Sequence, residues 1–143
     1  NYRMTDIQAA MGISQLKLLP IILQRRNEIA ACFDKAFCKS SKIQAVKTPD
    51  YVSNWNRQSY HLTLKNGSST KRNQLMDHLQ TCGISTRRGI PPIHKEPVYE
   101  SGLTLPVTEQ ISQSSFFIPI YPQLTDEEVE HIAASVLQGI QAI

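Results

Sequence analysis

The stretch "TRRGIPPIHKEPVY", residues 86–99, gathers the side chains of this chain that are best suited to holding an anion. Arg87 and Arg88 point to opposite sides if a strand runs through them, so one of the two can face a cleft. A guanidinium group binds phosphate through two parallel hydrogen bonds. The prolines reduce the entropy that a loop loses when it closes around a ligand. The alternative is a structural loop with a solvated arginine and a hydrogen-bonded His94.

The rest of the sequence contains no strong motif for catalysis or metal binding. The sequence has no glycine-rich phosphate loop, no GxSxG elbow and no HExxH motif. His78 and Cys82 stand four residues apart on a predicted helix, but no further ligand follows at a suitable spacing, so we predict no metal site. Cys32, Cys38 and Cys82 form no CxxC pair, and we predict three reduced, partly buried thiols.

The elements that position these residues begin with two predicted helices. Thr5 and Gln8 have the spacing of a capping box, which marks a helix start. Pro20 interrupts the pattern, and we expect it to lie in the first turn of a second helix that runs to about Lys39. The predicted buried stripe of that second helix consists of Ile22, Ile29, Cys32, Phe33, Ala36 and Phe37.

The rest of the chain alternates short strands with helices. Strands are expected around residues 43–47 and at "RQSYHLTL" (57–64), "ISTRR" (84–88) and "SFFIPIYP" (115–122); helices are expected at residues 70–83 and 107–114 and from a second capping box at Thr125 and Glu128. This order predicts an α+β fold with a small, mainly antiparallel sheet of three to four strands covered by helices.

Composition narrows the class of protein. The chain has 143 residues, of which 41% are hydrophobic and 19% charged, and its formal net charge is +3. These values fit one globular domain, and no apolar run or leader pattern suggests a membrane span or a secretory signal. The basic residues are dispersed rather than clustered, so we expect no nucleic-acid partner and no membrane partner, and we expect a cytoplasmic protein.

Three segments together resemble the DegT/StrS-type sugar aminotransferases. They are "NYRMTDIQAAMGISQLKLLPIILQRRNEIA", "GISTRRGIPPIHKEPVY" and "LPVTEQISQSSFFIPIYPQLTDEEVEHI", and they occur in that order across essentially the whole chain. The resemblance implies a pyridoxal 5'-phosphate (PLP) enzyme of the aspartate-aminotransferase fold, which transfers an amino group from glutamate to a keto sugar on a nucleotide carrier. It also implies that residues 1–143 are the C-terminal small domain of a longer, homodimeric protein.

The resemblance assigns roles to four residues. Asn1 matches a residue that reaches the PLP phosphate of the neighbouring subunit, and Arg3 matches a position near the nucleotide-sugar in the partner's site. His94 matches the last residue of a pattern like HYxxPxH, and Arg88 and Gly89 stand where many relatives have His-Tyr. We therefore expect Arg3, Arg88 and His94 to contact substrate, with an anionic contact from Arg88. For Arg3 the alternative is an ion pair at the start of the helix.

The same resemblance places the Schiff-base lysine and the aspartate that pairs with the pyridine nitrogen before this segment. No catalytic residue is therefore expected within the 143 residues, and the isolated chain is expected to be inactive. The alternative hypothesis is a stand-alone anion- or nucleotide-binding module that uses Arg87, Arg88 and Lys95.

Overall fold

The computed structural model describes residues 2–52, 55–99 and 102–143 and confirms an α+β fold. Its helices and strands, in chain order, are α1 (Asp6–Phe37), β1 (Ile43–Ala45), β2 (Tyr60–Leu64), α2 (Ser69–Thr81), β3 (Arg87–Arg88), the 3₁₀ turn η1 (Ile93–Lys95), α3 (Pro106–Ser114), β4 (Ser115–Ile118) and α4 (Asp126–Gln141). The four strands form one antiparallel sheet in the order β1-β2-β4-β3.

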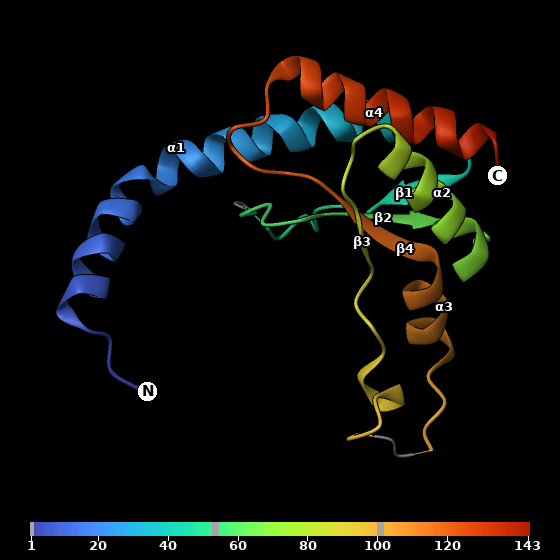
Figure 1. Cartoon of the computed structure of the whole chain (residues 1–143), viewed down its shortest axis with the longest axis horizontal. Helices are drawn as coiled ribbons and strands as arrows, with labels where there is room; N and C mark the ends of the chain where they lie inside the picture. Colours follow the sequence, from blue (N-terminus) through green and yellow to red (C-terminus); the bar gives the residue numbers. More distant parts are fainter. Residues whose placement is uncertain (1, 53–54, 100–101) are drawn as a thin grey trace.

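The hydrophobic core lies between one face of the sheet and the helices α1, α2 and α4 (Figure 1). Tyr60, Leu62 and Leu64 are buried on that face, while the intervening His61 and Thr63 are only half-buried. This alternation is the period of two that a half-covered strand requires. The rest of the buried hydrophobic core comes mainly from α1, α2, β4 and α4 and includes Ile29, Phe33, Leu75, Leu79, Phe116, Ile132 and Val136.

The predicted break at Pro20 is wrong, because α1 is one continuous helix from Asp6 to Phe37. The predicted capping box at its start is confirmed: Gln8 N donates to Thr5 Oγ1 at 3.3 Å, and Thr5 N donates to Gln8 Oε1 at 3.0 Å. Pro20 removes a single hydrogen bond from a long helix, and proline in a helix interior produces a bend rather than an end when the flanking turns are retained. Figure 1 shows α1 bending between its two halves.

All four predicted strands are shorter than expected, and for β2 and β4 the backbone gives a local reason. Arg57 has a φ of 45°, which is incompatible with extended backbone, so β2 begins only at Tyr60. Pro119 has no N–H to donate, and β4 ends directly before it. Only Arg87 and Arg88 of the predicted strand 84–88 pair with β4.

The cysteine prediction needs correction. Cys82 is half-buried as expected, but Cys32 and Cys38 are exposed, and all three thiols are free. Cys32 lies about 60° around α1 from the buried Ile29, at the margin of the buried face.

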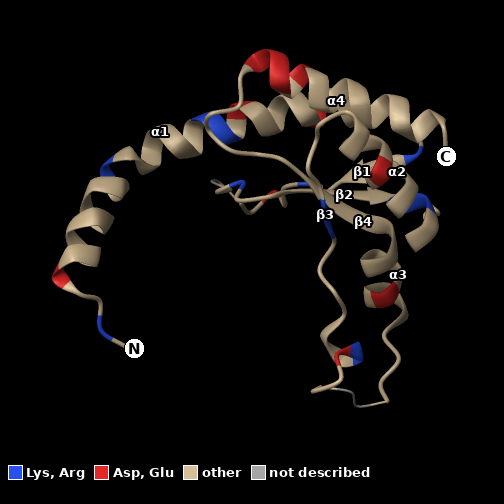
Figure 2. Ribbon diagram, in the orientation of Figure 1, with Lys and Arg blue, Asp and Glu red and all other residues tan. Residues whose placement is uncertain are grey.

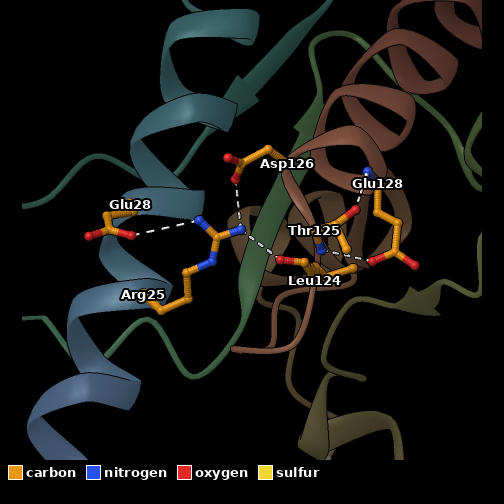
Figure 3. Close-up of polar contacts among 6 residues, drawn as sticks. All are labelled: Arg25, Glu28, Leu124, Thr125, Asp126 and Glu128. Carbon is orange, nitrogen blue, oxygen red and sulfur yellow. Dashed lines mark hydrogen bonds and ion pairs between the residues drawn. The ribbon is translucent and has the colours of Figure 1, made fainter.

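Helices α1 and α4 are joined by a polar contact centred on Arg25 (Figure 3). Its Nη2 donates to the Leu124 carbonyl at 2.6 Å and lies 2.8 Å from Asp126 Oδ1, and its Nη1 lies 3.6 Å from Glu28 Oε2. The hydrogen bond with Asp126 raises the pKa of Arg25. The second predicted capping box is confirmed beside it, because Thr125 and Glu128 exchange both bonds at the start of α4.

Candidate functional site

The expected substrate-binding segment projects away from the body of the molecule. We call residues 89–99 and 102–105 the arm; its first part runs out from β3 and carries η1, and its second part leads back to α3 (Figure 1). At its base, Gly89 N donates to the Ser115 carbonyl at 2.9 Å. A Cβ atom at position 89 would overlap Ser115 Oγ, so this close approach requires glycine.

Of the expected site residues that the structure describes, His94 is the most buried. Its side chain is only 5% exposed, and its Nε2 lies 3.0 Å from Glu109 Oε1. Since an ionised carboxylate can only accept, Nε2 carries the proton of this bond. His94 Nδ1 is also buried and has no hydrogen-bond partner among the described residues, which leaves one imidazole nitrogen free.

Glu109 is the residue that the sequence reasoning missed. Its Oε1 accepts from His94, from the backbone N–H of Leu105 at 3.0 Å and from Lys95 Nζ at 3.5 Å. One carboxylate atom therefore ties the outgoing and the returning segments of the arm together. The hydrogen bond from His94, followed by that from Leu105, lowers the pKa of Glu109 to about 2. The side chain of Leu105, which precedes Pro106, cannot cap the start of α3. The absence of a capping residue there was the sequence signal that a nearby acidic residue such as Glu109 has to bind the free backbone N–H groups.

Arg87 and Arg88 lie on opposite faces of the sheet, as the strand pattern predicts. Arg88 is exposed and pairs in register with the buried Phe116. Burial, followed by the positive charge of Arg88, lowers the pKa of Arg72, which is 5% exposed and bonds to the Ser112 carbonyl at 2.8 Å. Within the described residues Arg88 has no carboxylate partner.

The structure brings the expected residues together only in part. Arg88 and His94 belong to the same segment, at and beyond the base of the arm, whereas Arg3 precedes α1 in a different part of the molecule (Figure 1). Arg3 is exposed, and in the part of the chain that is described it forms no ion pair, so the alternative of an ion pair at the helix start finds no support. Asn1 lies outside the described residues.

The cationic cluster of the alternative hypothesis does not form. The guanidinium of Arg87 lies over the ring of Phe117, with Cζ 5.2 Å from the ring centre, on the face opposite Arg88. Lys95 is engaged with Glu109. Figure 2 shows the basic residues spread over several elements, while acidic residues gather at the start of α4.

Neither a metal site nor a membrane span is found in the described ranges. His78 Nε2 lies 3.8 Å from Cys82 Sγ, but no group of three potential ligands occurs among the residues that the structure describes. Over the same residues, no helix combines the length and the hydrophobicity needed to cross a bilayer.

Residues 1–137 match the model of the DegT/DnrJ/EryC1/StrS aminotransferase family. The chain belongs to this family. It is 29% identical over 136 residues to a dTDP-4-dehydro-2,3,6-trideoxy-D-glucose 4-aminotransferase of Saccharopolyspora spinosa. This alignment covers 95% of the chain and 34% of the relative. It is 28% identical to a GDP-perosamine synthase of Escherichia coli O157:H7, over 95% of the chain and 36% of that protein.

The structural comparison agrees with the sequence comparison. The putative sugar aminotransferase Spr1654 from Streptococcus pneumoniae, in its PLP-form, superimposes with a TM-score of 0.90 at 26% identity, over 98% of the chain and 36% of that protein. The PMP-form of Spr1654 gives the same values. The family and the fold expected from the sequence are therefore confirmed, and the chain spans about a third of the length of the relatives it matches.

Proposed function

We propose that this chain is the C-terminal small domain of a PLP-dependent aminotransferase that acts on a nucleotide-linked keto sugar, with glutamate as amino donor. The observation that carries the proposal is the family match over residues 1–137. Support for the substrate class comes from the relatives whose names specify dTDP- and GDP-linked sugars. A homodimer and a cytoplasmic location remain predictions of the same proposal.

The cofactor would not be held covalently by this chain. PLP supplies the electron sink for transamination, and it is anchored in such enzymes through a lysine imine. All eight lysines of this chain are exposed, whereas lysines that form imines are usually activated by a desolvated pocket or a neighbouring cation. The described residues therefore do not fit the imine role, and we assign them no catalytic step.

The role proposed for the described residues is to hold substrate. Arg88 and Arg3 are permanent cations without a carboxylate partner among the described residues, which suits the phosphates of a nucleotide-sugar. Glu109 fixes the imidazole of His94 from one side. For Asn1 we keep the proposal of a contact to the cofactor phosphate of the neighbouring subunit.

Two measurements on the chain test the proposal. Mixed with PLP, the chain should yield no borohydride-reducible lysine adduct at stoichiometric yield and no turnover of glutamate with a nucleotide-linked keto sugar.

The second measurement is a titration with dTDP-glucose, a stable nucleotide-sugar. It should shift the backbone amide signals of Arg88 and His94 in NMR spectra of the ¹⁵N-labelled chain, and Arg88→Gln should weaken that binding about tenfold. Turnover by the 143 residues, or shifts that spare Arg88 and His94, would contradict the proposal.

A further inference from the structure

A hollow of about 500 Å³ opens between the loop before β3, the turn after β4 and the start of α4, outside the site described above. Ile84, Leu124 and Ile132 line it and are each only 4% exposed, so its base is apolar. Phe117 and Tyr121 supply aromatic surface, and Tyr121 is 43% exposed. A concave, mostly apolar site of this size is typical for a small molecule.

One free cation lies in the lining of this hollow. Arg87 is exposed, and its guanidinium is held against the ring of Phe117. Among the described residues it has neither a carboxylate partner nor a hydrogen-bond acceptor. Because no described residue accepts from its guanidinium, the N–H donors of Arg87 are available for a forked contact with an oxyanion.

The α4 side of the hollow has the opposite character. Glu128 Oε2 accepts from the Thr125 backbone N–H at 2.9 Å, which holds this carboxylate within the capping box. His131 Nε2 lies 3.1 Å from the Cys82 carbonyl and donates to it. The negative charge of Glu128 disfavours an anion on this side, so an anionic group is favoured only beside Arg87.

We propose that the hollow is a binding site for a small molecule with an aromatic or apolar body and one anionic head group, a phosphate or a carboxylate. The head group binds Arg87, and the body lies on the apolar base beside Tyr121. Arg88, which pairs with the core-facing Phe116 on the other face of the sheet, takes no part. The inference is independent of the proposed function, since it uses none of Arg3, Arg88 and His94.

NMR titration of the ¹⁵N-labelled chain with phenyl phosphate tests the site. We expect saturable shifts of the amide signals of Thr86, Arg87, Phe117 and Tyr121. Inorganic phosphate and benzyl alcohol, which offer the head group or the ring alone, should each bind at least tenfold more weakly. Benzoate distinguishes a carboxylate head group from a phosphate.

Variants then separate the two parts of the site. Arg87→Gln should weaken phenyl phosphate binding at least tenfold, whereas Arg88→Gln, with the same charge change one residue away, should leave the shifts at Tyr121 unchanged. Tyr121→Ala should weaken phenyl phosphate but not inorganic phosphate. Three results would each overturn the proposal: shifts that map to Arg88 and His94, equal affinity for inorganic phosphate and phenyl phosphate, or full affinity in Arg87→Gln. Shifts at Arg88 and His94 would instead favour the proposed substrate site.

Discussion

The two halves of α1 both carry apolar residues, but these residues are buried in one half and exposed in the other. In the C-terminal half, Ile29, Ala30, Phe33 and Phe37 are buried against the sheet and α4. In the N-terminal half, comparable apolar residues are exposed, with Ile7 at 76% and Met11 at 66%. The difference shows that an apolar helix face is buried only where the chain itself provides a surface to pack against.

The largest expected effect comes from the buried half. Phe33 is 0% exposed, and the centre of its ring lies 6.0 Å from the ring centre of Phe37 and 5.0 Å from that of Tyr60. Phe33→Ala should lower the free energy of unfolding by about 3–5 kcal/mol, as for other buried aromatics. Met11→Ala in the exposed half should change it by less than about 0.5 kcal/mol. Urea denaturation of both variants measures the contrast, and similar losses would show that the two halves are equally packed.

The exposed half should instead control self-association. Ile7, Met11 and Leu18 lie on one face, within about 40° of each other around the helix. We expect the chain to form concentration-dependent oligomers or to bind a hydrophobic dye through this face. Replacing all three residues with Gln should return it to a monomer without changing its unfolding midpoint. Light scattering that shows a monodisperse monomer of the parent chain would contradict this expectation.

Arg25, near the junction of the two halves, should have a smaller effect. Its bonds to the Leu124 carbonyl and to Asp126 attach α1 to α4, and its side chain is 27% exposed. Arg25→Gln should cost about 1 kcal/mol, the range of a partly exposed charged hydrogen bond. Lys17→Gln removes the same charge from the exposed half and should be neutral. Equal effects of the two substitutions in thermal unfolding would remove the role assigned to this contact.

The smallest effect is expected in the arm and depends on pH. Folding lowers the pKa of Glu109 from 4.5 to about 2, so its stabilising contribution is complete above about pH 4.5 and is lost as the pH falls toward 2. Glu109→Gln should therefore flatten the fall of the melting temperature across this window. Glu130→Gln, an exposed position on α4, serves as the control. If both variants keep the slope of the parent chain, the carboxylate does not hold the arm.

Interactions between near neighbours in the chain were predictable from the sequence. Both capping boxes and the alternation of Tyr60, Leu62 and Leu64 depend on residues two to three positions apart, so residue type and spacing were sufficient. The α+β class and the family followed from the order of elements and from three motifs. The continuity of α1 through Pro20 was not predictable from the local sequence. Whether a helix continues through a proline depends on whether the rest of the helix is stable enough to offset one missing hydrogen bond.

Contacts between segments far apart in sequence were decided by the tertiary structure. The hydrogen bond of His94 to Glu109 and the hollow beside Arg87 both join elements whose distance in the chain says nothing about their distance in space. The sequence by itself determined which residues could cap, alternate and carry charge, because these properties belong to residue types and short spacings. Packing alone decided which apolar face was covered and which arginines of the described residues have no carboxylate partner, because burial and pairing depend on the surface that the folded chain supplies.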